Sequence, residues 1–505
     1  MFSLPKARSV LWNPTQEELR NIVSKMPSSQ KTIYGNFNTN TMVDSRSANS
    51  TFIVSTKTKS MLNISRKDYQ LISRMQDEYI QDQDMLIING YIGQDPNFRV
   101  GCQLFIEQSQ ANIAAMQQQL FFPPDKNIIP KFTVIYTPNL TAPGFPDDRL
   151  IAVDIENFTT RILGTDYFGE SKKGGLRMWN KWVYDQGGLA LHAGCKVWPD
   201  IEGKQKLALI IGLSGTGKTT TTFREQMGSL PVQDDFCALF SQGVIYSSEN
   251  GCFAKTYDLK PNEEPVLYEA LTQSDSWLEN VAVSKEGNVD FLDGNRTTNG
   301  RGIFEFDRIP HFNPIYLPKV DYIFLLNRNF NILPAVAKLK PEQACAYFML
   351  GETTGTSAGG KSEEGKFLRV PGTNPFFTED DACQGNRFLE ILKTIPEVSV
   401  FLLNTGQIGG MENDPRSKKV SIQHSSAIQE GIVRNNIIWR EDPDFGYFIA
   451  DQISRFDDPE LLNPKLLYQR QNRDVEYMNI LRILKNDRQD YLNNFYGLNQ
   501  TIKIL

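Results

Sequence analysis

The sequence predicts a mixed α/β protein with two domains, an N-terminal α/β domain over residues 1–200 and a C-terminal domain over residues 201–505. Two observations predict the C-terminal fold. The segment KLALIIG (206–212) is an almost continuous apolar run, typical of a strand buried on both faces, and it leads directly into a glycine-rich turn. DYIFLLNRN (321–329) and VSVFLLNTG (398–406) repeat this pattern, and each ends in turn residues.

The N-terminal domain is predicted from strand and helix patterns that follow one another. We expect strands at TFIVST (51–56) and DMLIINGYI (84–92), with a helix at RKDYQLISRMQDEYIQ (66–81) between them. Two further strands are expected within NIIPKFTVIYTPN (127–139) and LIAVDI (150–155), which are separated by a turn rich in Gly and Pro. At the other end of the chain, the charged tail from about residue 456 has apolar residues at i, i+3 and i+4 spacing and is predicted to be helical.

The composition is that of a globular protein. Of 505 residues, 40% are hydrophobic and 22% charged, which excludes wholesale disorder. A net charge of −6 argues against nucleic acid as the main partner. No apolar run approaches the roughly 18 residues of a membrane span, and the first residues lack a secretory apolar region, so we expect a cytoplasmic protein without a membrane partner. The 6 cysteines have no CxxC spacing, which indicates reduced thiols.

A phosphate-binding loop follows the buried strand at 206–212. The pattern G-x-x-x-x-G-K-[ST] is matched in full, and its glycines permit backbone conformations in which several N–H groups converge on phosphate oxygens. The alternative is a chance match in a glycine-rich turn, which the buried strand directly upstream disfavours. The nucleotide-binding residues predicted here are Gly212, Leu213, Ser214, Gly215, Thr216, Gly217, Lys218, Thr219 and Thr220.

Three further features are only weak evidence for a functional site when each is taken alone. Asp234 and Asp235 follow the loop, and such a pair suggests metal binding, although an isolated pair is more often a solvated turn. Lys172 and Lys173 lie beside glycines, and a lysine pair is normally part of a solvated surface. His192 lies in the apolar segment LALHAGCKVW, where a histidine is usually a satisfied core residue.

Taken together and in this order, the motifs resemble the ATP-dependent phosphoenolpyruvate carboxykinase family. The resemblance runs from about residue 30 to 440 and is densest between 160 and 302. The matching stretches include LGTDYFGESKKG, LALHAGCKV, GLSGTGKTT, QDDF, ENGCFAKTYDL and ENVAVSKEGNVDFLDGNRTTNGR.

The resemblance implies a two-domain phosphoenolpyruvate carboxykinase-like fold with the P-loop in the C-terminal domain. The implied reaction is oxaloacetate + ATP ⇌ phosphoenolpyruvate + CO₂ + ADP, the decarboxylating lyase reaction of gluconeogenesis. By the same resemblance, Lys173, His192 and Asp235 are expected to bind a catalytic Mn²⁺, and Thr219 the Mg²⁺ that accompanies ATP. Carboxylate and imidazole suit Mn²⁺, whereas lysine binds a metal only as the free amine, which a neighbouring cation such as Lys172 favours.

The resemblance also implies roles for the residues that contact substrate. Arg46, in SRSANSTFIV, is expected to bind a carboxylate of oxaloacetate, since arginine is a bidentate partner for carboxylate and phosphate. Tyr167 and Arg301 match the family's substrate-site tyrosine and second arginine, and Lys255 its further phosphate-contacting lysine. The expected catalytic residues are Lys173, Lys218, Arg301 and Tyr167, and the expected substrate-binding residues are Arg46, Tyr167, Lys173 and Arg301.

The chain departs from the family pattern at several positions. Phe236 follows the aspartate pair where the family has glutamate, and Ser45 replaces a glycine before Arg46. Gln407 replaces a tryptophan, Lys419 stands at the position of the adenine-contacting arginine, and Ser425 at that of its neighbouring threonine. These changes leave open whether ATP, GTP or pyrophosphate is preferred.

Two other functions remain open at this point. One is a P-loop phosphotransferase on the same scaffold with a different acceptor, and the other is a catalytically silent nucleotide-binding protein. The oligomeric state and the physiological direction of the reaction are not readable from the sequence.

Overall fold

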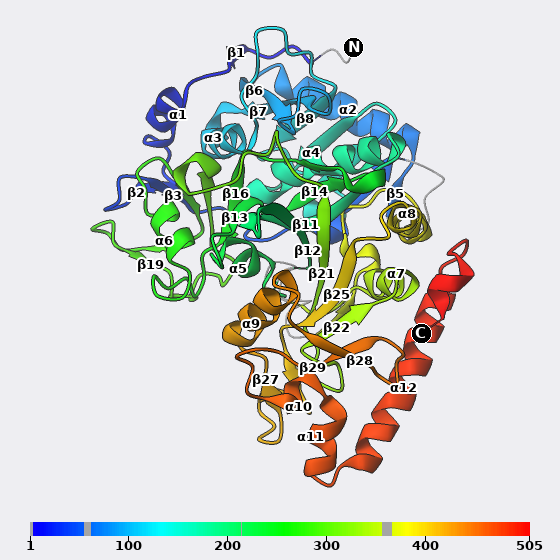
Figure 1. Ribbon diagram of the computed structural model, residues 1–505. Coiled ribbons are helices and arrows are strands. Elements are labelled where there is room, and N and C mark those ends of the chain that lie inside the picture. Colours follow the sequence, from blue (N-terminus) through cyan, green and yellow to red (C-terminus); the bar gives the residue numbers. More distant parts are fainter. Residues whose placement is uncertain (1–3, 55–61, 214, 356–365, 505) are drawn as a thin grey trace.

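Three large β-sheets organise the computed structural model, which describes residues 4–54, 62–213, 215–355 and 366–504. The first sheet is built from the N-terminal part of the chain, and the second from later strands (Figure 1). In spatial order the first sheet contains β1 (Ser9–Trp12), β6 (Asp84–Ile92), β7 (Val100–Glu107), β8 (Phe132–Thr137), β10 (Thr159–Leu163), β9 (Leu150–Asp154), β4 (Thr51–Val54) and β5 (Asn63–Ile64).

The second and third sheets carry the segments that form the candidate site. The second contains β15 (Ile245–Ser247), β14 (Phe236–Leu239), β11 (Leu189–Ile201), β12 (Lys204–Ile211), β21 (Val320–Asn327), β25 (Ser399–Asn404), β22 (Val336–Leu339), β29 (Phe448–Gln452) and β28 (Ile438–Glu441), with β13 (Leu230–Gln233) paired to β11. The third contains β16 (Gly251–Lys255), β20 (Arg301–Glu305), β17 (Trp277–Glu279), β3 (Phe37–Thr39) and β2 (Ser29–Lys31). Short pairs are formed by β18 (Ala282–Val283) with β19 (Val289–Asp290), β23 (Glu352–Thr354) with β24 (Phe367–Arg369), and β26 (Gln407–Ile408) with β27 (Lys418–Lys419).

The helices lie around these sheets, and α4 joins two of them because it contacts β8 and β10 of the first sheet and β11 of the second. The long C-terminal α12 forms the outer flank of the molecule (Figure 1). The α-helices are α1 (Gln16–Val23), α2 (Arg66–Ile80), α3 (Ala111–Leu120), α4 (Phe168–Asp185), α5 (Lys218–Phe223), α6 (Pro265–Leu271), α7 (Pro341–Leu350), α8 (Asp381–Lys393), α9 (Ile422–Val433), α10 (Pro459–Leu462), α11 (Pro464–Arg470) and α12 (Asp474–Asn493).

Within the described residues the strands and helices predicted from sequence pattern are confirmed, and so is the mixed α/β class. The last two residues of the strand expected at 51–56 lie outside the described residues. The clearest case is β12, whose side chains are buried on both faces. Leu207, Leu209 and Ile211 pack in one hydrophobic cluster, whereas Ala208 and Ile210 pack in another. The strand can be apolar throughout because β11 and β21 flank it on either side within the sheet.

The domain division at residue 200 stays a prediction. β11, which ends at Ile201, is already part of the second sheet and pairs with β12 across a tight connection. The third sheet joins β2 and β3, from the start of the chain, to strands of residues 251–305.

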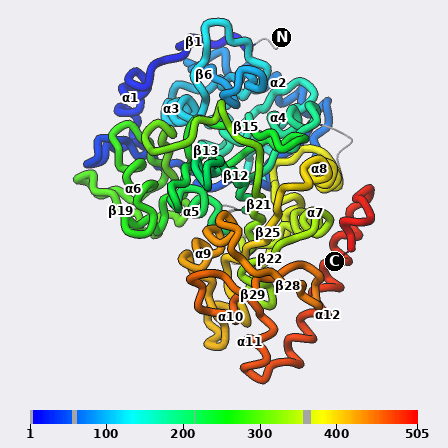
Figure 2. The backbone as a smooth tube through the Cα atoms, in the orientation of Figure 1, coloured from blue at the N-terminus to red at the C-terminus, as the bar shows by residue number. Residues whose placement is uncertain are grey.

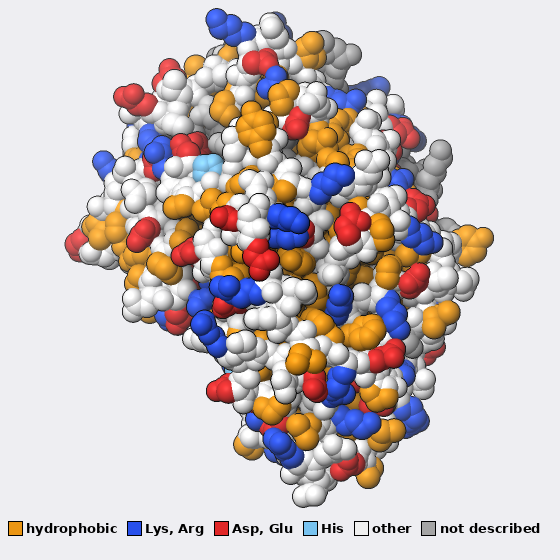
Figure 3. All heavy atoms as spheres, viewed as in Figure 1, with side chains coloured by type: hydrophobic (Ala, Val, Ile, Leu, Met, Phe, Trp, Pro, Cys, Tyr) orange, Lys and Arg blue, Asp and Glu red, His pale blue; other side chains and the backbone are white. Residues whose placement is uncertain are grey.

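Three general properties complete the description. All 6 cysteines are free thiols, as their spacing predicted. No helix in the described ranges is long and apolar enough to cross a membrane. On the face drawn in Figure 3, basic and acidic side chains are interspersed.

One glycine allows the helix after the phosphate loop to lie close to β11. A Cβ atom on Gly194 would come within 2.1 Å of Thr222 Oγ1, a distance that real contacts do not reach. Thr222 is buried on α5, where its hydroxyl donates a hydrogen bond of 2.9 Å to the backbone oxygen of Lys218. The absence of a side chain at Gly194 therefore sets how closely the phosphate loop approaches the sheet.

We expect Gly194→Ala to lower the free energy of unfolding by about 1–3 kcal/mol, because the added methyl group overpacks this contact. Denaturant unfolding of the variant measures the loss. In Gly194→Ala/Thr222→Ala the nearest atom is removed, so the double variant should lose less than the sum of the two single variants. If the losses in unfolding free energy of the two single variants simply added in the double variant, the proposed clash between Gly194→Ala and Thr222 would be contradicted.

Candidate active site

One cavity brings together half of the predicted site residues, including the expected catalytic residues. Its volume is about 170 Å³. The predicted residues that line it are Arg46, Tyr167, Lys173, His192, Leu213, Lys218, Thr219, Asp235 and Arg301.

Strand pairing explains how distant parts of the sequence meet here. β11 and β12 are antiparallel, so the start of β11 lies beside the end of β12, and the N–H of Gly212 donates to the backbone oxygen of His192 at 3.3 Å. β13 and β14 both pair with β11, through Cys195 and His192 respectively. The aspartate pair at 234–235 connects β13 to β14 and therefore lies next to both His192 and the phosphate loop.

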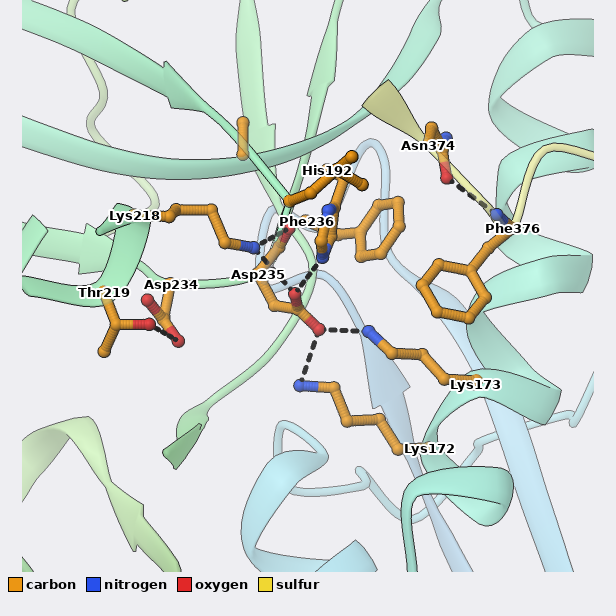
Figure 4. Close-up of polar contacts among 12 residues, drawn as sticks. Lys172, Lys173, His192, Lys218, Thr219, Asp234, Asp235, Phe236, Asn374 and Phe376 are labelled. Atoms are coloured by element: carbon orange, nitrogen blue, oxygen red, sulfur yellow. Dashed lines mark hydrogen bonds and ion pairs between the residues drawn. The ribbon is translucent and has the colours of Figure 1, made fainter. Parts of the chain in front are cut away.

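Four nitrogen-bearing side chains converge on the Asp235 carboxylate (Figure 4). His192 Nε2 lies 2.8 Å and Lys218 Nζ 2.9 Å from Oδ1. Lys172 Nζ lies 3.0 Å from Oδ2, and Lys173 is also paired with Oδ2. The two lysines come from α4, His192 from β11 and Lys218 from α5, so three elements are joined at one carboxylate.

Burial and charge set the protonation states in this cluster. Burial opposes ionisation of Asp235, but the surrounding lysines hold the pKa of its carboxyl well below the usual range. Burial, opposed by Asp235 and aided by the charge of Lys172, lowers the pKa of Lys173 to about 7. Burial and the nearby Lys218 ammonium lower the pKa of His192 to about 3, so the imidazole is neutral near pH 7.

These states fit a divalent transition metal. Asp235 presents an ionised carboxylate, His192 a neutral imidazole, and Lys173 an amine that loses its proton easily, which are the forms in which such groups bind metals. Nδ1 of His192 is buried and has no hydrogen-bond partner within the described ranges. Among those residues no three His, Cys, Asp or Glu side chains form a metal-binding group. The candidate set at Asp235 instead combines one carboxylate, one imidazole and one lysine amine.

Asp234 takes part in a separate contact with the phosphate loop. The Thr219 hydroxyl donates to Asp234 Oδ2 at 3.3 Å (Figure 4). Burial raises the pKa of the Asp234 carboxyl, although Lys218 opposes this shift. The pair places one hydroxyl and one carboxylate together, which is the kind of oxygen-donor set that Mg²⁺ prefers.

The loop that carries Arg46 is fixed to the helix that carries the lysines. The N–H of Ser47 donates to Glu170 Oε1 of α4 at 2.6 Å, and Arg177, one more buried residue of α4, pairs with Glu170 at 3.4 Å. The Arg46 guanidinium lies 5.9 Å from the centre of the Phe376 ring. Arg46 is therefore positioned at the cavity and is not a free surface arginine.

Asn299 connects the two other predicted substrate contacts. Its side-chain amide donates to the Tyr167 hydroxyl at 3.4 Å, and its carbonyl oxygen accepts from Arg301 at 2.8 Å. In the third sheet Arg301 is the register partner of both Lys255 and Glu279. Burial raises the pKa of Glu279 to about 8, so this carboxyl is largely protonated near pH 7.

Some predicted nucleotide residues lie away from the cavity lining. Lys255 is on β16, Lys419 on β27 and Ser425 on α9, while Ser214 falls outside the described residues. Lys419 is the register partner of Gln407, so two of the departures from the family pattern form one cross-strand pair.

Several residues of the site have no signal of their own in the sequence. Glu249 is buried and pairs with Lys172 Nζ at 2.9 Å. The Phe376 ring lies 4.5 Å from Lys173 Nζ and 5.4 Å from the Arg177 guanidinium. A lone glutamate or phenylalanine is unremarkable in a sequence, and only the tertiary arrangement brings these side chains to the cluster.

The chain is similar in sequence to a family of known proteins. The family model described as phosphoenolpyruvate carboxykinase matches residues 8–459. A protein of Aeropyrum pernix named phosphoenolpyruvate carboxykinase (ATP) is 31% identical over 411 residues, covering 79% of this chain and 78% of the relative. A protein of the same name from Staphylococcus haemolyticus is 30% identical over 421 residues, covering 78% of this chain and 75% of the relative. The chain therefore belongs to the phosphoenolpyruvate carboxykinase (ATP) family, as its motifs indicated.

Proposed function

We propose that the protein catalyses oxaloacetate + ATP ⇌ phosphoenolpyruvate + CO₂ + ADP. The observation that carries the proposal is the convergence of Lys173, His192 and Lys218 on Asp235 within a cavity that also contains Arg46 and Arg301. A protein that only bound nucleotide would need the phosphate loop but not two arginines and a metal-binding group beside it. Membership of the family supports the same reaction.

In this proposal the small acid binds between Arg46 and Arg301. Both guanidinium groups border the cavity, and arginine binds carboxylate and phosphate through paired N–H donors. The Tyr167 hydroxyl, held by Asn299, gives a neutral polar contact on the same side.

The nucleotide binds across the phosphate loop. Gly215 and Gly217 have φ values of 83° and 86°, conformations that favour glycine and turn backbone N–H groups toward phosphate oxygens. Lys218 brings its ammonium to the same point, and Lys255 supplies a further positive charge from β16. Lys419 and Ser425 are assigned to the base, with ATP as the proposed donor.

Two metal ions are part of the proposal. Lys173, His192 and Asp235 would hold Mn²⁺, and Thr219 with Asp234 would hold the Mg²⁺ that accompanies ATP. When bound, these ions supply Lewis acidity and offset phosphate charge.

The cationic side chains stabilise the charge that the reaction creates. Cleavage of the C–C bond releases CO₂ and leaves an electron pair on an enolate, whose oxygen attacks the γ-phosphorus in line as ADP leaves. Lys218 and Arg301 both line the cavity, and in this proposal their fixed positive charges stabilise the transition state more than the ground state. The rings of Phe236 and Phe376 reduce access of water to the cluster.

We expect the purified protein to form CO₂ and phosphoenolpyruvate from oxaloacetate and ATP when Mn²⁺ and Mg²⁺ are present, and Lys218→Met to reduce kcat by about 10²–10³-fold. Loss of a charge-assisted contact to the transferred phosphoryl group costs about 3–4 kcal/mol, and each 1.36 kcal/mol is tenfold in rate. A coupled assay with ATP, GTP and pyrophosphate as separate donors measures both. The exposed Lys285→Met is the matched control.

Phosphoryl transfer to another acceptor, without CO₂ release, would favour a different phosphotransferase. Nucleotide binding without turnover of any donor would favour the silent binding protein.

We expect His192→Ala to weaken Mn²⁺ binding by at least tenfold and to leave the Tm of the metal-free protein within about 2 °C of wild type. Titration with Mn²⁺ alone, followed by calorimetry, measures the first effect and a thermal melt the second. His311→Ala, at a histidine that contacts the Ile309 backbone instead of Asp235, is the control. Unchanged Mn²⁺ affinity together with a lowered Tm would assign His192 to the core only.

We expect Arg46→Lys to raise KM for oxaloacetate and for phosphoenolpyruvate, by an energy on the order of 1–3 kcal/mol, because lysine cannot reproduce the paired N–H donors of arginine. KM for the nucleotide should barely change, since that ligand binds on the phosphate loop. Steady-state kinetics with each substrate varied in turn measure both, and the exposed Arg74→Lys is the control. Unchanged KM values for both acids would remove Arg46 from the substrate site.

A further inference from the structure

An arginine near the end of the chain is buried against a strand that reaches the active-site cavity. α12 is a largely exposed helix, with Val475, Met478 and Ile483 all open to solvent. Arg488 of the same helix is only 1% exposed. α12 packs against α7 and lies along the flank of the molecule (Figure 2).

Arg488 makes a two-point ion pair with Glu352 of β23. Its Nη2 lies 2.7 Å from Oε2 and its Nε 3.0 Å from Oε1, and both side chains are almost fully buried. Nη1 also donates to the Tyr347 hydroxyl at 3.3 Å. Burial opposes ionisation of Glu352, but Arg488 outweighs it and lowers the pKa of the carboxyl.

A second arginine ties the neighbouring strand to the same helix. Arg369 of β24 donates from Nη2 to Glu352 Oε1 at 2.9 Å and to Asp487 Oδ2 of α12 at 2.5 Å. Glu352 and Arg369 are register partners in the β23–β24 pair. Two consecutive residues of α12, Asp487 and Arg488, therefore hold both strands.

The opposite face of this strand pair forms part of the cavity wall. Successive side chains of a strand point to opposite faces, so Thr353 and Leu368 point away from α12. These two residues are also register partners, and both line the cavity that contains Arg46 and Lys173. A change in how α12 holds one face would shift the wall on the other.

We propose that Arg488 is a positioning residue for the small-acid substrate, which fixes the β23–β24 wall of the cavity through Glu352. The proposal rests on the proposed function, because it assigns a substrate-dependent role to a residue that touches no substrate. A buried ion pair is weak support for stability, since an apolar pair of similar volume often replaces it without loss, but its two-point geometry fixes orientation. Lysine provides a single point charge and cannot hold Glu352 in the same way.

The first experiment compares Arg488→Lys with wild type in steady-state kinetics, at a temperature well below the Tm of both. We expect kcat/KM for oxaloacetate and for phosphoenolpyruvate to fall at least tenfold, while the Kd for MgATP stays within twofold. Arg482→Lys, at an exposed arginine of the same helix, is the matched control and should match wild type. Unchanged acid kinetics in Arg488→Lys would overturn the proposal.

A second variant separates positioning from stability. In Arg488→Met/Glu352→Leu the ion pair is replaced by an apolar pair, and Arg369 keeps Asp487 as a partner. We expect the Tm to recover to that of wild type while the loss in kcat/KM for the acids persists. Recovery of both would show that Arg488 has a structural role alone, and would overturn the proposal.

Hydrogen exchange gives a readout that does not depend on activity. Amides of β23 and β24 should exchange at least fivefold faster in Arg488→Lys than in wild type, with no change in Arg482→Lys. If wild-type protein shows no carboxykinase turnover, the proposed function fails, and these exchange rates still test whether Arg488 holds the wall. Equal exchange in both proteins would overturn the inference.

Discussion

The carboxylate of Asp235 is the point on which the rest of the site depends. Lys172 and Lys173 reach it from α4, His192 from β11 and Lys218 from the phosphate loop, so one buried anion joins elements that contact two different sheets. A buried carboxylate is tolerated only when it is well paired, and here the surplus of nitrogen partners keeps it ionised. Burial and repulsion between adjacent positive charges also lower the pKa values of Lys173 and His192, so the imidazole is neutral and the amine loses its proton easily. The forms of Lys173 and His192 that can bind a metal therefore follow from where the fold buries these side chains and which charges it places beside them.

The backbone that delivers these groups is organised by β11. The strand pairs with β12 on one side and with β13 and β14 on the other, so the phosphate loop, His192 and the aspartate pair are fixed to one another by strand register. Gly194 lets α5 lie against the same strand. The relative positions of these groups do not depend on long flexible side chains, which suits a reaction that needs fixed charges near the developing enolate and phosphoryl oxygens.

Local patterns in the sequence predict a large part of this arrangement, and the reason is physical. A strand buried on both faces must be apolar, and a phosphate loop needs glycine at fixed spacing, so β12 and the loop after it are visible in a few residues. The proposed metal ligands Lys173, His192 and Asp235 could be predicted only from the order of several motifs along the chain, and their roles stay predictions. Glu249, Asn299 and Arg488 could not be found this way, because a single polar residue acquires its meaning from a partner far away in the chain. The domain boundary has no local signal either, since β11 and β12 continue one sheet across residue 200.

The departures from the family pattern differ in their physical consequences. Gln407 and Lys419 form one cross-strand pair away from the cavity lining, so these two changes do not alter the contacts of Asp235. Phe236 is different, because its ring lies 4.9 Å from Lys173 Nζ. A glutamate there would stabilise the lysine ammonium and raise the pKa of Lys173, whereas the ring leaves burial and Lys172 to lower it. The substitution next to the aspartate pair therefore favours the free amine that a metal ligand must be, and it is compatible with the proposed chemistry.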